Sequence, residues 1–563
     1  MGRSWLLLVF GLALVAAGCR SGGGGGSTAA APSTTPSVSP PVSSPAAPRP
    51  SPWPGVHFVC AQWSQDERDI LIENTDNIRY PPPQHPAPPA LLRGYPPRLH
   101  TLRVPGLVEA VPLGWSADGV WLALGGMDAQ GRSGLYGLNG PGARPRLLVT
   151  GATITHPKIT YSFSWAPVGA RFFLADSAGQ AFIGDAAAGA SARIGTAGHQ
   201  RALLPPAPVW VRELPTPGVW SDDAGRLAFV NSQKRLVSYD FGRGQLQETQ
   251  SSPDRFAWAP GGRYLLAARE TAEAHPSDLR QWHQEPHYAR YAILDTQDGT
   301  EREVTDRGQA LCEGAWRGHA LWSPDGRLVA VATGEAGSGD LLVCDAQGRR
   351  VVTRKGVYRS WWRADGRALF TSEGKPAGLW LLPFGPGDAD PRPVHDCTPY
   401  PPYLADPHWQ RWLLSATRSG GLVAISLETG GKVEFPGIAV EPVRWHEQVG
   451  DVTRDQSRFL FVWALPPSPA PRPGGRPEWR AYEFRICQVP SGAAKTVQVD
   501  VGATKDRSPA VYAYACYWSP DGRVIVFRYI WDTLAGWAAL DIDTGRITRL
   551  SGYFVDWTPA PGC

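Results

Sequence analysis

A tryptophan, a tight-turn tetrapeptide and an apolar run recur along this chain, and this repeat constrains the fold more than any other feature. The stretch LWSPDGRLVAVAT begins at Leu321, and YWSPDGRVIVFRY begins at Tyr517. Self-similarity at a fixed spacing of tens of residues is typical of solenoids, propellers and arrays. The sequence therefore predicts a body built from copies of one small unit.

Weaker copies of the pattern fill the rest of the chain. Ten copies occur between Trp63 and Trp518, roughly one every 50 residues, a spacing typical of propeller blades. A half-copy, FVDWTPAPGC, closes the chain. The copies start at Gln62, Gly114, Ser164, Val219, Ala257, Leu321, Trp361, His408, Arg444 and Tyr517.

Each copy has the residues of a short antiparallel sheet. In Ser-Pro-Asp-Gly, proline presets φ, aspartate hydrogen-bonds the local backbone and glycine adopts the left-handed conformation. A strand that ends at the tryptophan thus reverses into a second strand. That strand, such as RLVAVAT, is continuously apolar, as expected for a sheet covered on both faces. Further turns, as in LLVCDAQGRRVVT, join a third and a fourth strand.

Four short antiparallel strands repeated at this spacing predict the blades of a β-propeller. We expect an all-β protein with a single ring of eight to ten four-stranded blades; two smaller propellers in tandem are the alternative. The final half-copy supplies only a first strand. We therefore expect the segment around HFVCAQW, near the start of the repeats, to complete its blade, because ring closure removes exposed sheet edges.

The W-S-P-D-G-R copies at Trp322 and Trp518 resemble the WD-like propeller repeat of the TolB family. The resemblance covers residues 56–563 and implies a propeller of the bacterial envelope. It does not include the α/β domain of TolB, so a role in a Tol–Pal system is not implied. A tethered lipoprotein with such a propeller is also similar to the LpqB-type lipoproteins of actinobacteria, although no second domain stands between tether and first repeat here.

The first residues predict an export signal and a lipid anchor. Arg3 precedes an apolar run, residues 5–17, that is too short to span a membrane comfortably. The small residues directly before Cys19 resemble the bacterial lipobox, in which the cysteine is lipidated and becomes the new N-terminus. The alternative is a plain secretory signal. We expect residues 1–18 to be a lipoprotein signal peptide.

The tract that follows predicts a tether. Residues 19–55 are rich in glycine and serine, then in serine, threonine and proline, with no apolar periodicity to bury. We expect this tract to be disordered and to hold the propeller, residues 56–563, away from a membrane. The predicted location is the cell envelope, lipid-anchored and extracytoplasmic or periplasmic.

Charge and cysteine content add two expectations. The 55 basic and 51 acidic residues give a net charge of +4, which offers no dense basic surface for nucleic acid. Disulfides are permitted outside the cytoplasm. The pairs we expect are Cys312–Cys344, Cys487–Cys516 and Cys60–Cys563, with Cys397 left free.

No catalytic, cofactor or metal motif stands out. The nucleophile elbow G-x-S-x-G, the zinc motif H-E-x-x-H and Walker-type glycine loops are absent from the sequence. His275, His283 and His287 cluster, but Pro286 disfavours the helix that would align a metal pair. The stretch DTQDGTERE is read as a hairpin turn, since it lacks calcium-loop spacing. We expect no catalytic residue, cofactor or metal.

Four insertions between second and third strands are the best candidates for a binding surface. They start near Asn74, Glu270, Pro466 and Tyr529. Propeller loops of one type emerge on a common face, and aromatic side chains are enriched at binding hot spots. The alternative is that the insertions are surface loops without a binding role. The candidate partner-binding residues are Trp282, His283, Tyr288, Trp479 and Trp531.

The functional expectation is a non-enzymatic binding or scaffolding module, monomeric, for a protein partner. One alternative is a carbohydrate-binding propeller for cell-wall polysaccharide. Another is a hydrolase or lyase acting in the central channel, which needs converging carboxylates or histidines just before each tryptophan. Those positions hold few acids, which favours binding over catalysis.

We predict that Cys19→Ser releases the protein from membranes or leaves its precursor uncleaved, because the anchored thiol is lost. Fractionation of cells, with immunoblotting for size and location, measures this outcome. A mature-sized variant that still fractionates with membranes would contradict the lipid anchor.

Overall fold

The structure is a computed structural model that describes residues 52–557 with interruptions. The longest undescribed segments are 63–86, 271–286, 311–321, 396–411, 440–450, 466–480 and 501–513. The described residues belong to one compact unit, Arg49–Cys563. The predicted signal peptide and nearly all of the predicted tether lie outside them.

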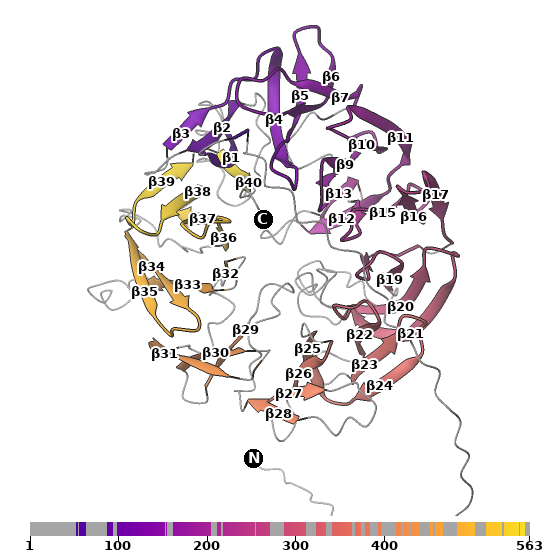
Figure 1. Cartoon of the computed structure of the whole chain (residues 1–563), viewed down its shortest axis with the longest axis vertical. Coiled ribbons are helices and arrows are strands. Elements are labelled where there is room, and N and C mark those ends of the chain that lie inside the picture. The colour runs from indigo at the N-terminus through magenta and orange to yellow at the C-terminus, as the bar shows by residue number, and fades with distance from the viewer. Residues whose placement is uncertain are drawn as a thin grey trace, which may run out of the picture. The chain divides into compact units, whose positions relative to one another are not determined.

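The described residues form ten antiparallel sheets of three or four strands, and a separate hairpin (Figure 1). The first sheet contains β1 (Val56–Gln62), β2 (Ala87–Arg93), β3 (Arg98–Thr101) and β40 (Gly552–Trp557), and the second contains β4 (Leu107–Trp115), β5 (Leu122–Asp128), β6 (Ser133–Leu138) and β7 (Arg146–Thr150). The third sheet contains β8 (Ser162–Trp165), β9 (Arg171–Ala175), β10 (Gln180–Asp185) and β11 (Ala190–Thr196), and the hairpin of β12 (His199–Leu203) and β13 (Val211–Pro215) follows it. The fourth sheet contains β14 (Val219–Trp220), β15 (Arg226–Val230), β16 (Leu236–Asp240) and β17 (Gln245–Glu248).

The remaining six sheets follow the same order along the chain. They consist of β18 (Arg255–Trp258), β19 (Tyr264–Glu270), β20 (His287–Asp295), β21 (Glu301–Ala310); β22 (Leu328–Thr333), β23 (Asp340–Asp345), β24 (Arg350–Arg354); β25 (Val357–Trp362), β26 (Ala368–Ser372), β27 (Gly378–Leu382), β28 (Arg392–His395); β29 (Trp412–Ala416), β30 (Gly421–Ser426), β31 (Lys432–Ala439); β32 (Asp451–Val452), β33 (Arg458–Leu465), β34 (Ala481–Gln488), β35 (Ala494–Asp500); and β36 (Tyr514–Trp518), β37 (Val524–Trp531), β38 (Leu534–Asp541), β39 (Ile547–Leu550).

Consecutive sheets pack face to face through shared apolar clusters. From β32–β35 through the sheet of β1 and on to β25–β28, nine sheets are linked by eight such clusters. Both faces of most sheets are thereby covered, which accounts for the continuous apolar second strands. The chain is a β-propeller, as the repeat predicts, and an unbroken series of nine sheets across the chain ends disfavours two rings in tandem.

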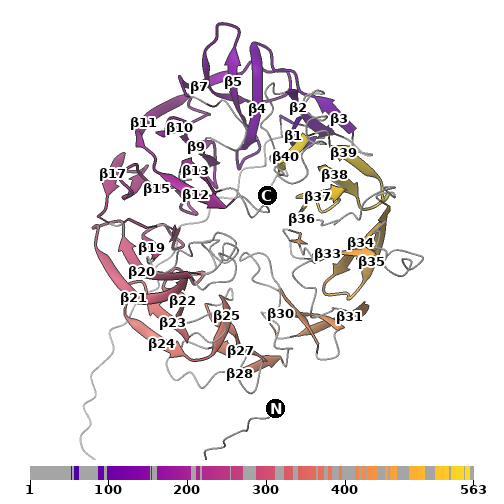
Figure 2. The same cartoon turned by 180° about the vertical axis from the view of Figure 1, so that it is seen from behind.

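The two ends of the propeller meet in one blade, as predicted. Strand β40 pairs antiparallel with β1, with Phe58 opposite Trp557, and the two strands lie side by side in Figures 1 and 2. The rings of these two residues meet edge to face at 5.4 Å between centroids. The last strand of the chain therefore serves as the first strand of the blade that β1, β2 and β3 complete.

The repeated tetrapeptide forms the turn that its residues predict. In the β22 blade, the Ser323 hydroxyl donates to an Asp325 carboxylate oxygen at 2.6 Å and accepts the Leu328 N–H at 2.9 Å. Gly326 has a φ of +68°, and a Cβ there would lie 2.6 Å from the Pro260 carbonyl oxygen of the preceding blade. Glycine is thus required both by conformation and by close approach.

Two of the ten expected copies occupy different places from those predicted. In the sheet of β1, the first-strand tryptophan is Trp557, because residues 56–62 form the second strand. In the β32 blade, Val452 pairs with Phe459 and holds the tryptophan position, so Trp445 does not. The sequence pattern misses this position because the turn Thr453–Arg458 takes the place of Ser-Pro-Asp-Gly. In this turn the Thr453 hydroxyl accepts a hydrogen bond from the Arg458 N–H. Trp63 and Trp445 themselves lie outside the described residues.

The expected disulfides are wrong. Cys60, Cys344 and Cys487 are free and buried, and each was expected to belong to a different pair. All three lie on second or third strands inside blades, where burial raises the pKa of the Cys60 and Cys487 thiols to about 12 and that of Cys344 to about 11. These thiols behave as small apolar side chains of the core.

We predict that deleting residues 552–563 lowers the free energy of unfolding by about 3 kcal/mol or more, because a paired strand and the Trp557 contact are lost. Denaturant titration measures this change. A chain cut after Trp557 keeps β40 and is the matched control. Equal stability of both truncations would contradict closure by β40.

We also predict that iodoacetamide at about pH 8 modifies Cys60, Cys344 and Cys487 only after unfolding, since a buried thiol with a raised pKa is protonated and inaccessible. Peptide mass spectrometry of native and denatured samples measures the labelling. A non-reduced map that shows any of the three in a disulfide would contradict the free state.

Candidate functional site

All four predicted insertions fall between the second and third strands of a blade, but only three are long connections. The fourth is wrong as an insertion, because residues 529–531 and 534–537 belong to the paired strands β37 and β38. Because consecutive connections of an antiparallel meander alternate between its two ends, these four belong to the end opposite the Ser-Pro-Asp-Gly turns. We call this end of the blades the insert side and the other the turn side. The insert connections are 63–86 after β1, 271–286 after β19, 466–480 after β33 and 532–533 after β37.

The structure places two of the candidate partner-binding residues. Tyr288 lies in β20 opposite Gln309, and Trp531 ends β37 opposite Leu534. Both therefore stand where a strand borders an insert connection. Trp282, His283 and Trp479, like the predicted anchor Cys19, lie outside the described residues.

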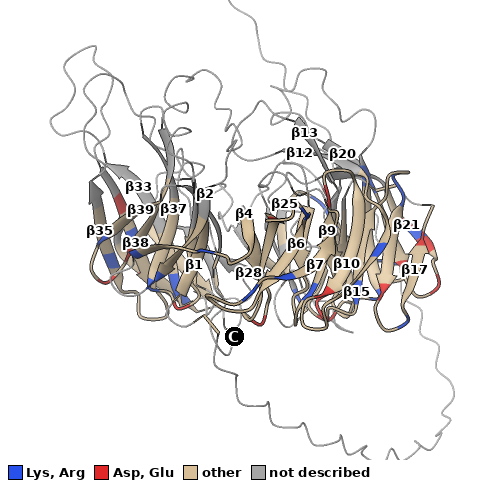
Figure 3. Cartoon of the chain, turned by 90° about the horizontal axis from the view of Figure 1, so that it is seen from above, with Lys and Arg blue, Asp and Glu red and all other residues tan. Residues whose placement is uncertain are grey.

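Several arginines on the turn side donate hydrogen bonds to a neighbouring blade. Figure 3 shows acidic and basic residues gathered at one edge of the strands, near the ends of β10 and β17. Arg226 donates to the Gly262 carbonyl oxygen at 2.7 Å and to the Thr296 hydroxyl at 2.9 Å in the next blade. Arg171 and Arg458 likewise donate to carbonyl oxygens of the following blade. These three arginines therefore help to position neighbouring blades.

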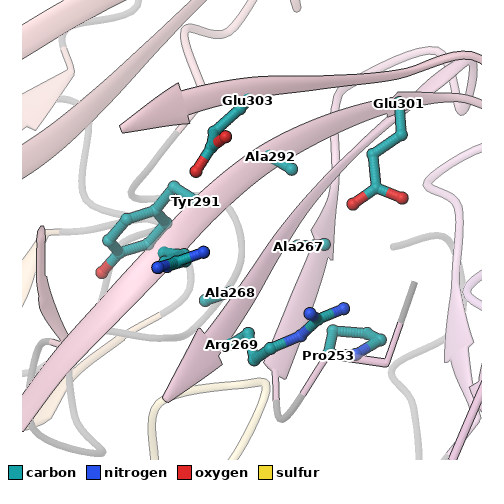
Figure 4. A pocket seen from close by; sticks show the side chains of 9 residues that line it. Pro253, Ala267, Ala268, Arg269, Tyr291, Ala292, Glu301 and Glu303 are labelled. Carbon is teal, nitrogen blue, oxygen red and sulfur yellow. The ribbon is translucent and has the colours of Figure 1, made fainter. Parts of the chain in front are cut away.

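A cavity of about 330 Å³ lies on the β18–β21 sheet (Figure 4). Its floor includes Ala267 of β19 and Ala292 of β20, which are cross-strand partners. Residues 265 and 267 share one face of β19, and Leu265 packs on the preceding blade, so this floor faces that blade. The cavity is thus a local gap beside a blade interface.

The gap arises where two alanines stand in place of the larger apolar pairs of four other blades. Counting from the first-strand tryptophan, Ala267 and Ala292 occupy the positions that fill the interface in those blades. Small side chains cannot reach across the space between two sheets, and the lost contacts leave a cavity. The equivalent pairs in those four blades are Leu124–Tyr136, Leu174–Phe182, Phe229–Val237 and Val331–Leu342, whereas the closing blade has Cys60–Ala90.

Four charged residues surround this floor. Arg269 and Arg290 are direct cross-strand partners, two residues beyond the alanines toward connection 271–286. The Arg269 Nε donates to the Ser252 carbonyl oxygen at 3.3 Å. Glu303 lies opposite Ala292 on β21, and Glu301 lies two residues away. Within the described part of the chain, no ion pair joins these arginines to a carboxylate.

Arg269 and Glu303 lie on opposite sides of β20, whereas Arg290 lies on β20 itself, next to β21. Figure 4 shows Glu301 and Glu303 on one side of the alanines and Arg269 on the other. Like charges placed directly opposite each other on a sheet repel, so the Arg269–Arg290 pair favours an anion beside it. The arrangement can therefore bind a polar ligand with separated charges.

Sequence reasoning missed this pocket. The signal was present in YLLAARE and YARYAILD, where alanine replaces the bulky residues of other copies. Strand register was needed to recognise that the two alanines are partners. Among the described residues, no cluster of histidine, cysteine, aspartate or glutamate could hold a metal ion, and no helix is long and apolar enough to cross a membrane.

No protein-family model and no curated protein matches the chain. Among solved structures, a eukaryotic initiation factor is 11% identical, covering 90% of this chain and 100% of that one, with a TM-score of 0.42. The C-terminal WD40 domain of Sif2 is 11% identical over 78% of this chain and 99% of that one, TM-score 0.33. An oligogalacturonate lyase from Vibrio parahaemolyticus is 10% identical over 78% and 93%, TM-score 0.33. Function is not transferable at this level of similarity, and the class of the chain, a β-propeller, follows from its strand pairing.

Proposed function

We propose that this β-propeller is a non-enzymatic binding module of the cell envelope, anchored through Cys19, that holds a protein partner on its insert side. The observation that carries the proposal is that three long connections, 63–86, 271–286 and 466–480, share one position in the blade, between the second and third strands. They are therefore directed to a common side of the sheets.

Packing explains why this position suits recognition. The faces of the blades are covered by their neighbours, and the turn side uses its arginines to join adjacent blades. Changes in length at the insert side disturb neither set of contacts. Loops on a rigid scaffold are where binding residues concentrate.

The envelope location is part of the proposal and rests on the sequence. The lipobox-like segment before Cys19, the proline-rich tether and the TolB-like repeats at Trp322 and Trp518 support it. A polysaccharide ligand or a channel enzyme would require other residues to bind, and the capture experiment below distinguishes a protein partner from these.

We predict that Trp282→Ala and Trp479→Ala each weaken capture of a protein partner from solubilised membranes by about tenfold, as expected for an aromatic hot spot, with little change in melting temperature. The control is Trp258→Ala, because Trp258 is buried and its Nε1 donates to the Val219 carbonyl oxygen at 2.8 Å. This control should lower the melting temperature.

Quantitative mass spectrometry of captured proteins and calorimetry of each variant measure the two effects. Loss of stability with unchanged capture in the Trp282 and Trp479 variants would mean that these rings pack within the blades. Enrichment of glycan without protein would overturn the protein partner.

A further inference from the structure

We propose that the cavity of the β18–β21 blade is a binding site for an aliphatic α-amino acid, a small molecule that carries both a carboxylate and an ammonium group. The proposal concerns a small ligand and does not depend on the protein partner proposed above. It rests on the floor of the cavity, on its two arginines and on its two glutamates.

The floor of the cavity carries small apolar side chains, and the groups around it are mostly charged. Ala267 is 3% exposed, and its partner Ala292 continues the same surface on the next strand. Where other blades fill this place with pairs such as Phe229–Val237, here a volume of about 330 Å³ is left open. Small-molecule sites have volumes from about 300 Å³ upward and are lined by apolar groups with a few polar ones. An aliphatic side chain fits this floor.

The arginine end suits a carboxylate. Arg269 and Arg290 project from paired positions on neighbouring strands, so their Cβ atoms are about 5 Å apart. Both side chains are exposed, and the Arg269 Nε is already committed to the Ser252 carbonyl oxygen, which orients its guanidinium. Guanidinium groups present paired N–H donors that match the two oxygens of a carboxylate.

The glutamate end suits an ammonium group. Glu303 is on β21, two strands away from Arg269 on β19, which is a separation of about 10 Å between backbones. Side chains that reach inward from both strands leave room between their charges for a small ligand. Figure 4 shows this separation, with Glu301 and Glu303 across the alanines from Arg269.

A ligand with a single charge would satisfy only half of this site. A carboxylate alone leaves the glutamates without a cation, and an amine alone leaves the adjacent arginines to repel each other. A zwitterion complements both ends and adds no net charge. The geometry therefore favours an amino acid over simple anions.

The test is isothermal titration calorimetry of the full-length protein with L-leucine and with two analogues, each of which lacks one charged group of leucine. 4-Methylpentanoate retains the carboxylate and lacks the ammonium, whereas 3-methylbutylamine retains the ammonium and lacks the carboxylate. We expect saturable binding of L-leucine, and binding at least about tenfold weaker for each analogue, since each loses a charge-assisted contact.

Variants locate the site. Arg269→Gln and Glu303→Gln should each weaken L-leucine binding by about tenfold, because each removes one charged contact. Arg193→Gln is the matched control, since Arg193 is an exposed strand arginine of another blade. The double variant A267F/A292V copies the Phe229–Val237 pair and should abolish binding by filling the cavity, with a melting temperature showing that it folds.

Three outcomes would overturn the proposal. The first is no saturable binding of L-leucine by the wild-type protein. The second is equal affinity for L-leucine and 4-methylpentanoate, which would identify a simple anion site. The third is unchanged binding in both Arg269→Gln and Glu303→Gln, which would place the ligand elsewhere.

Discussion

The rest of this structure depends on the packing of a first-strand tryptophan against the preceding blade. The indole N–H of Trp258 donates to the Val219 carbonyl oxygen at 2.8 Å, and that of Trp165 donates to the Gly114 carbonyl oxygen at 2.9 Å. In each case the acceptor belongs to the first strand of the preceding blade. The Trp258 ring is buried and the Trp165 ring is half-buried against apolar side chains of both sheets, so each residue combines a directional bond with apolar packing. The same bond recurs from Trp322 to the Ala257 carbonyl oxygen at 3.3 Å, so this contact positions several consecutive blades on one another.

Because the blades pack so closely, small side chains at a blade interface stand out. Blades that must cover one another select large apolar pairs, as at Leu174–Phe182 and Val331–Leu342. The equivalent pairs Ala267–Ala292 and Cys60–Ala90 are smaller, and charged residues collect beside the first of them. A cavity reduces stability, since contacts are lost without compensation. An open space beside opposed charges is the feature on which the proposed ligand site rests.

Several features of the fold were predictable from residues near each other in the chain. Ser323, Asp325 and Gly326 specify their turn through local hydrogen bonds and one positive φ, so the sequence pattern was sufficient. The prediction of the repeat failed where other residues replace the tryptophan and the Ser-Pro-Asp-Gly turn. Val452 holds a tryptophan position, and no tryptophan motif marks it. The disulfides also failed, because spacing along the chain says little about which cysteines face one another across blades.

The sequence by itself determined the repeated strand-and-turn unit, the closure of the propeller by its last strand and the placement of the long connections between second and third strands. These depend on turn residues and apolar periodicity, which act over a few neighbouring positions. The charged cavity was decided by tertiary structure alone. Arg269 and Arg290 are 21 positions apart in numbering (290 − 269), and Ala292 meets Glu303 only across a hairpin. Their juxtaposition depends on strand register, and the space above them depends on how two blades pack.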